Sequence, residues 1–163
     1  MSRAPEPSDD DERGLLLGWL DFHRDALAAK CAGLTDDQLV STSAVPSMLS
    51  LLGLVRHLTE MERHYLVDAL SGRRLGPVYC TEQDPEADIE SLEASMAEQS
   101  IRRWHDERAA ADTLIARCAD LSAPATSGWG SARRHVVKVL QEYARHNGHA
   151  DIIRERLDGS RGE

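Results

Sequence analysis

Apolar residues recur along most of the chain at the three- and four-residue spacing of amphipathic helices. This pattern predicts four long helices, over residues 14–32, 48–70, 89–119 and 132–157, with loops such as "SGRRLGP" and "LSAPATSGWGS" between them. No stretch alternates apolar and polar residues over enough positions to indicate a strand. We therefore expect an all-α fold, a four-helix bundle with at least one long crossover connection.

Polar and glycine residues mark where these helices begin and end. A new helical turn is expected at Thr35, after a stop at Gly33, while Ser47 is placed to cap the second long helix and Gly159 to end the fourth. The third helix has its expected inward positions at Leu92, Met96, Ile101, Ala109 and Leu114. These positions define the face that we expect to pack in the bundle.

The chain has 163 residues, which is an ordinary length for one domain. We expect the bundle to span residues 14–159, preceded by an acidic, proline-containing lead-in, residues 1–13, that is disordered. No apolar run reaches the roughly 20 residues of a bilayer crossing, and the start of the chain lacks a signal-peptide pattern. A cytoplasmic protein with no membrane partner is the expectation.

Charge and cysteine content narrow the function further. The net charge of −9 argues against nucleic-acid binding, which requires a clustered basic surface. The three cysteines, Cys31, Cys80 and Cys118, have no paired close spacing, so we expect reduced thiols rather than disulfides or a cysteine zinc site.

The stretch "EYARHNGHADIIRERLDG" carries three metal-ligand side chains on one face of the predicted fourth helix. Glu142, His146 and His149 fall in a narrow sector, which Val139 and Ile153 extend in apolar form. Glu142 and His146 are four residues apart, a spacing at which two side chains can converge on one ion. The same spacing also occurs in ordinary ion pairs on a helix face, so both interpretations remain open.

A further imidazole, His57, lies in the second helix, in "SLLGLVRHLTEMERHYL". It is flanked by Leu54 and Leu58, which favours an inward position, whereas His64 lies two turns on, about 10 Å along the axis. His57, Glu142 and His146 together form a set that suits a catalytic zinc with an open position, although Fe²⁺, Ni²⁺ or Mn²⁺ could bind the same donors. The other histidines, His23, His105 and His135, are each expected to be hydrogen-bonded core or surface residues.

These two helix motifs, together with "GLTDDQL", resemble the DinB superfamily, in particular its actinobacterial mycothiol-transferase-like branch. The resemblance covers about Leu15 to Gly159 and implies a four-helix bundle with a divalent metal held by three side chains. Many DinB-like proteins use three histidines. Glu142 departs from that pattern. In this respect the sequence is similar to the mycothiol-dependent maleylpyruvate isomerases, which combine two histidines with one glutamate. The resemblance therefore implies His57, Glu142 and His146 as ligands, with His149 as an accessory residue or an alternative to Glu142.

The function that the resemblance implies is a metal-dependent thiol S-transferase, in which mycothiol attacks an electrophile that the sequence does not identify. It also implies a homodimer, and it assigns no catalytic residue beyond the metal ligands. Two other functions remain open at the level of sequence. One is a metal-dependent hydrolase or isomerase using the same site, and the other is a non-catalytic binding or stress-response bundle.

Overall fold

The computed structural model describes residues 4–8 and 11–161, and the elements in these residues are helical, with no strand. The elements are α1 (Glu12–Cys31), α2 (Asp36–Leu39), α3 (Leu51–Met61), the π-helix η1 (Glu62–Asp68), α4 (Ala69–Ser71), the 3₁₀-helix η2 (Ala94–Met96), α5 (Ala97–Arg117) and α6 (Ala132–Asp158). The prediction of an all-α fold is confirmed. None of these helices is both long and apolar enough to cross a bilayer.

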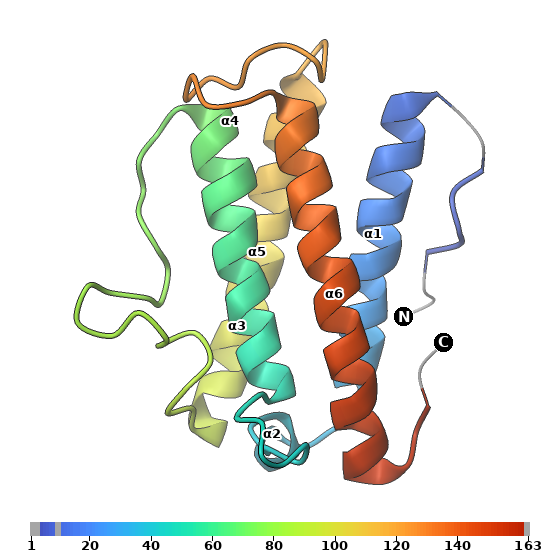
Figure 1. The fold of residues 1–163 in the computed structure, drawn as a ribbon, viewed down its shortest axis with the longest axis vertical. Helices are drawn as coiled ribbons and strands as arrows, with labels where there is room; N and C mark the ends of the chain where they lie inside the picture. The colour runs from blue at the N-terminus through green and yellow to red at the C-terminus, as the bar shows by residue number, and fades with distance from the viewer. Residues whose placement is uncertain (1–3, 9–10, 162–163) are drawn as a thin grey trace.

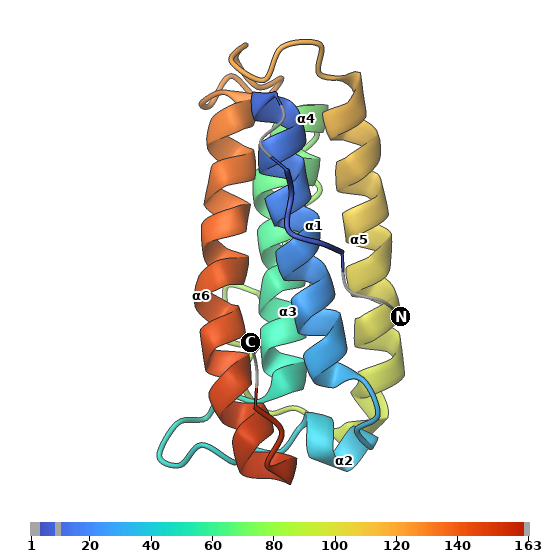
Figure 2. The same ribbon diagram turned by 90° about the vertical axis from the view of Figure 1, so that its right-hand side faces the viewer.

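The long helices lie side by side along one axis, and α3, η1 and α4 continue one another as a single rod (Figure 1). Helix α6 packs against α1 and α3, while α5 packs against α3 and η1. The rod and α5 run in the same direction, so residues 72–93 must return along the outside of the molecule (Figures 1 and 2). This long connection passes beside α3 and carries part of the site described below.

The core consists of the apolar faces of these helices. Its largest fully buried apolar side chains include Leu20, Leu27, Leu54, Leu58, Trp104, Tyr143, Ile115 and Ile153. Burying one such side chain contributes about 1.5–3 kcal/mol relative to leaving it in water, so this shared core holds the helix positions. The side chains that α3 and α6 turn toward each other are therefore fixed in register.

Two helix starts differ from the sequence prediction. The second long helix is capped by Ser50 instead of Ser47: the Ser50 hydroxyl accepts from the Gly53 N–H at 3.1 Å. The third was expected from residue 89, but residues 89–93 form a turn in which Ser91 has a φ of 55°, outside the helical range. The expected inward residue Ala109 is exposed, because the buried face of α5 follows a different register.

The predicted boundaries at Gly33, Thr35 and Gly159 are confirmed. Thr35 caps α2 in a capping box with Gln38, and Gly159 follows α6 with a positive φ of 79°. Gly33, after α1, likewise has a positive φ of 74°. All three cysteines are free, as expected.

The lead-in is only partly within the described residues. Residues 1–3 and 9–10 lie outside them, so the predicted disorder of this segment stays a prediction. In residues 4–8, the Ala4 N–H donates to Asp25 at 3.2 Å, and Pro7 packs against Gly18 of α1. A Cβ on Gly18 would lie 2.6 Å from the Pro7 Cβ, which explains why a glycine is needed at this contact.

Candidate metal centre

The three residues singled out by the sequence, His57, Glu142 and His146, meet where α3 packs against α6. One ligand atom from each lies within 4.8 Å of the others. The Glu142 Oε2 atom is 3.9 Å from the His57 Nε2 atom and 3.4 Å from the His146 Nε2 atom. Glu142 and His146 are each only 8% exposed. Two imidazole nitrogens and one carboxylate oxygen therefore converge in a largely buried place.

Local sequence explains how each helix presents these groups. On α6, Val139 and Ile153 are fully buried above and below the polar residues, so the same stripe faces the bundle throughout. On α3, Leu54 and Leu58 are also fully buried, which leaves His57 at the edge of the packed face, with its side chain 20% exposed. The apolar positions thus set the direction of the ligand-type side chains.

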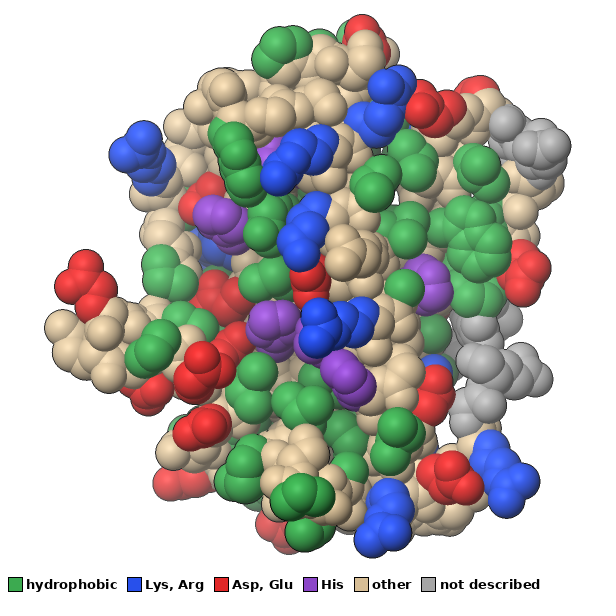
Figure 3. Space-filling model, in the orientation of Figure 1, with side chains coloured by type: hydrophobic (Ala, Val, Ile, Leu, Met, Phe, Trp, Pro, Cys, Tyr) green, Lys and Arg blue, Asp and Glu red, His purple; other side chains and the backbone are tan. Residues whose placement is uncertain are grey.

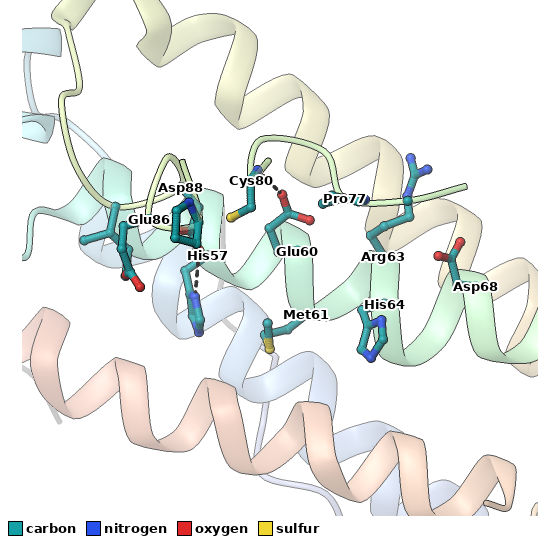
Figure 4. Close-up of a pocket in the computed structure, with 13 residues that line it drawn as sticks. His57, Glu60, Met61, Arg63, His64, Asp68, Pro77, Cys80, Glu86 and Asp88 are labelled. Carbon is teal, nitrogen blue, oxygen red and sulfur yellow. Dashed lines mark hydrogen bonds and ion pairs between the residues drawn. The ribbon is translucent and has the colours of Figure 1, made fainter. Parts of the chain in front are cut away.

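His57 has a partner that the sequence analysis missed. Asp88, from the 72–93 connection, places its Oδ2 atom 2.9 Å from the His57 Nδ1 atom (Figure 4). Burial alone would raise the pKa of Asp88, but the hydrogen bond and charge of His57 outweigh it and lower that pKa. A carboxylate that accepts the Nδ1 proton leaves the Nε2 lone pair of His57 directed at the other two residues. No sequence spacing links Asp88 to His57, because the loop alone brings them together.

Glu142 is held from its other side by Lys138, one turn earlier on α6. The Lys138 ammonium pairs with the Glu142 Oε1 atom, which leaves Oε2 toward the two imidazoles. Burial raises the pKa of Glu142, but the Lys138 hydrogen bond and charge, with His146 and His57, bring the pKa below its ordinary value. Glu142 is therefore a carboxylate at neutral pH. The four-residue spacing from Lys138 was visible in the sequence as a signal of this pair.

His146 is neutral in these surroundings. Burial, followed by the charges of His57 and His149, lowers its pKa to about 4. The Nδ1 atom of His149 lies 3.3 Å from the Nδ1 atom of His146, whereas the Nε2 atom of His146 is the one near Glu142. His149 therefore contacts the nitrogen that is not part of the three-residue cluster.

The donor set fits a divalent metal. Tetrahedral zinc with bonds of about 2.0–2.2 Å separates its ligand atoms by about 3.4 Å. The contacts of Glu142 with the two imidazoles, at 3.4 and 3.9 Å, are close to that separation. A carboxylate hydrogen-bonded to a ligand histidine, as Asp88 is to His57, is also the usual support of a metal ligand.

The remaining histidines do not join this cluster in the described part of the chain. His64 and His105 are exposed, whereas His135 is buried, with its Nε2 atom 2.6 Å from the Trp129 carbonyl oxygen. The expectation of core or surface positions is confirmed for His105 and His135. His64 lies further along the helix rod, as the axial distance predicted.

A hollow of about 450 Å³ opens beside His57, between the helix rod and the 72–93 connection (Figure 4). Its walls include Met61, Ile89 and the thiol of Cys80. Burial, followed by the Asp88 carboxylate, raises the pKa of Cys80 to about 12. Cys80 therefore stays protonated at neutral pH and is not a thiolate nucleophile. Histidine side chains also gather at the centre of this face of the molecule (Figure 3).

These features define a class: a helical protein whose His–Glu–His cluster could hold a metal ion beside a small hollow. The model of the mycothiol-S-transferase family matches residues 15–159, and the chain belongs to that family. The match confirms the resemblance to DinB-like, mycothiol-transferase-like proteins. A search of curated proteins found no match.

Proposed function

We propose that the chain is a divalent-metal-dependent mycothiol S-transferase on a DinB-like four-helix bundle, with the metal held by His57, Glu142 and His146. One observation carries the proposal: these three donors converge beside a hollow in a member of the mycothiol-S-transferase family. His149, which contacts the outer nitrogen of His146, is assigned the accessory role. The reaction breaks the S–H bond of the thiol and forms a bond between its sulfur and the electrophile. The proton goes to the group that leaves the electrophile or, in an addition, to the atom that receives the electrons of the broken π bond.

A divalent ion at this place would supply Lewis acidity that keeps a coordinated thiol in its thiolate form at neutral pH. Asp88 holds the ring of His57 and fixes its tautomer, so that Nε2 faces the cluster. Lys138 holds the carboxylate of Glu142 in place. Both partners lie outside the donor set and orient it.

We propose that the nucleophile comes from outside the chain, because burial and the Asp88 carboxylate disfavour the thiolate form of Cys80. This agrees with a low-molecular-weight thiol as co-substrate. The apolar side of the hollow, which includes Met61, Pro85 and Ile89, is suited to an electrophile with an apolar body.

Zinc is the metal that we propose, because two imidazoles and one carboxylate, with a position left open, suit a catalytic zinc site. Fe²⁺, Ni²⁺ and Mn²⁺ accept the same donors and are alternatives that metal analysis separates. We also propose a homodimer, and light scattering at micromolar protein should then give twice the mass of the 18.0 kDa chain. A mass of one chain would contradict the dimer.

Elemental analysis followed by a mycothiol-consumption assay tests the proposed function. We expect about one divalent metal per chain and thiol consumption that stops with chelator and returns with zinc. Arg145→Ala, an exposed change on α6, the helix that carries Glu142 and His146, serves as the control for His57→Ala on α3. Consumption of mycothiol at an unchanged rate after complete metal removal would contradict the proposal.

A further inference from the structure

Trp129 stands on a loop whose backbone is firmly held. It is 45% exposed and is the one aromatic residue among the exposed large hydrophobic side chains of residues 4–8 and 11–161. The Ser127 N–H donates to the Ala69 carbonyl at 3.0 Å, which ties the loop to α4. Gly128 and Gly130, on either side of Trp129, both have positive φ values, 79° and 69°, that favour glycine. A large aromatic side chain is thus displayed in a fixed position.

The surroundings of Trp129 are aromatic and basic. The Arg134 guanidinium lies 4.4 Å from its ring centroid, and the Tyr65 and His64 rings lie 5.8 and 5.9 Å away. The Lys138 ammonium is 5.7 Å from the Tyr65 ring centroid. We name these five residues, His64, Tyr65, Trp129, Arg134 and Lys138, the aromatic–basic platform.

The platform is continuous with the candidate metal centre. Lys138, at one end, is the residue that pairs with Glu142. A second hollow, of about 490 Å³, lies beside Trp129, and it shares His64 and Asp68 with the hollow beside His57. Figure 4 places His64 and Asp68 along the same stretch of the helix rod. A ligand that occupied both hollows would reach from His57, past His64, to Trp129.

The side chains of this second hollow combine both signs of charge with hydroxyl groups. Besides Trp129 it is lined by Asp68, Arg73, Arg74, Thr126 and Ser127. An anion would face the Asp68 carboxylate, and an apolar ligand would cover two exposed guanidinium groups and two exposed hydroxyls without hydrogen-bonding to them. A polyol suits all of them, because its hydroxyls both donate and accept, while its C–H face can lie on an aromatic ring.

Mycothiol has this chemistry at the end remote from its thiol, since its cysteine is joined through an amide to a pseudodisaccharide of glucosamine and inositol. We propose that the aromatic–basic platform and the second hollow bind this pseudodisaccharide, with Trp129 as its stacking surface. This inference rests on the proposed function for the identity of the thiol. It adds the residues that distinguish mycothiol from simpler thiols.

A binding test that needs neither metal nor turnover separates the two proposals. The probe is the thiol-free glucosaminyl-inositol, titrated by calorimetry into the full chain after metal removal. We expect the parent to bind it and Trp129→Ala to bind about tenfold or more weakly, with Trp129→Phe in between. Arg134→Met should weaken binding about threefold or more. Ile152→Ala, an exposed change elsewhere on α6, is the control and should bind as the parent does.

Kinetics with two thiols provide the second readout. We expect Trp129→Ala to raise the KM for mycothiol about tenfold while leaving the KM for N-acetylcysteine, which lacks the polyol, unchanged. Circular dichroism establishes that each variant is folded. Equal probe binding by the parent, Trp129→Ala and Arg134→Met would overturn the inference, as would equal rises in KM for both thiols. If the parent binds the probe but consumes no mycothiol, the proposed function fails and the polyol site stands.

Discussion

Two buried polar groups of residues lie in this bundle, and they differ in how completely they are hydrogen-bonded. The first is an internal network centred on Arg24 and Glu62. Arg24 donates through Nε and Nη2 to the two carboxylate oxygens of Glu62, at 2.8 and 2.7 Å. Tyr143 donates to Glu62 at 3.0 Å and accepts from the Trp104 indole N–H at 2.7 Å. Every charge in this network has an opposite charge or a donor against it.

The second group is the cluster of His57, Glu142 and His146. When the Nδ1–H group of His57 donates to Asp88 and its Nε2 atom carries a lone pair, that lone pair faces the Glu142 Oε2 atom, itself an acceptor, at 3.9 Å. Two acceptors that face each other in a buried place are stabilised when a cation enters between them. The comparison teaches that burial of polar groups alone does not mark a site. What marks it is the convergence of metal-ligand atoms from three side chains.

The largest expected difference between the two regions comes from making the same substitution in each after metal removal. Glu62→Gln leaves Arg24 without its buried counter-charge and should lower the free energy of unfolding by about 3–5 kcal/mol. Glu142→Gln weakens only the pair with the partly exposed Lys138 and should cost less than about 1 kcal/mol. Urea unfolding of the two variants measures both values. Similar losses of unfolding free energy would mean that Glu142, like Glu62, contributes to the stability of the metal-free protein, which would contradict the distinction between the two regions.

Metal addition should distinguish the two regions by the stability that each variant gains. At a free metal concentration of about 100 times its Kd, the parent and Glu62→Gln should each gain about 2.7 kcal/mol of stability. Glu142→Ala should gain much less, because a donor is lost, whereas His149→Ala should retain most of the gain. Thermal unfolding with and without zinc measures these shifts. A full gain in Glu142→Ala, together with a loss in His149→Ala, would make His149 the third ligand.

The role of Asp88 predicts an intermediate effect. Asp88→Asn removes the negative charge that supports the His57 ring and should weaken metal binding about 10- to 100-fold, or about 1.4–2.7 kcal/mol. Competition with a chromophoric chelator measures this affinity. Asp84→Asn, an exposed change in the same connection, is the matched control. An affinity equal to that of the parent would show that Asp88 only ties the connection to α3.

The sequence predicted the helices because they depend on local periodicity. Glu142 and His146 share a helix and His57 has apolar neighbours, which suggested that these side chains point inward, but spacing left a metal site and an ordinary ion pair both open. The resemblance to DinB-like proteins selected the set of three. Asp88 could not be found in this way, since it reaches His57 through a loop with no periodic pattern. Ser50 took the place of Ser47 as a cap because both residues are equally suitable in sequence, and packing chose between them.

The errors on α5 and the missed π-helix have a related cause. Ala109 was expected inside, but the buried face of α5 includes the polar residues Ser100 and Glu107, which interrupt the apolar pattern. Glu107 is buried because it pairs with Arg63 of η1, and Arg63 lies next to Glu62 in the π-helix. The burial of Glu107 thus goes with a long-range ion pair, and the π-helix carries the partner of that pair. A pattern of apolar and polar letters does not encode such pairs.

A third buried polar group, His135, tests whether one unpaired nitrogen is enough to make a metal site. Of the substitutions discussed, the one at His135 has the smallest expected effect. Its Nδ1 atom is buried without a hydrogen-bond partner, but within the described residues His135 belongs to no group of three metal-ligand side chains. We therefore expect His135→Gln to leave zinc affinity unchanged. The measurable consequence of His135 should instead be a dependence of stability on pH.

Burial, with the charges of Arg134 and His64, lowers the pKa of His135 despite the opposing effect of the Trp129 carbonyl. Above the unfolded pKa of about 6.5, both states are neutral there and His135 adds no pH dependence. As the pH falls below about 6.5, the unfolded chain binds a proton that the folded chain does not, so stability falls by at most about 1.4 kcal/mol per pH unit. Urea unfolding between about pH 7 and 5 should therefore show a shallower loss in His135→Gln than in the parent. Val137→Gln, which adds the same side chain at an exposed position, should keep the parent's slope. An unchanged slope in His135→Gln would mean that His135 accepts its proton in the folded chain as readily as in the unfolded one.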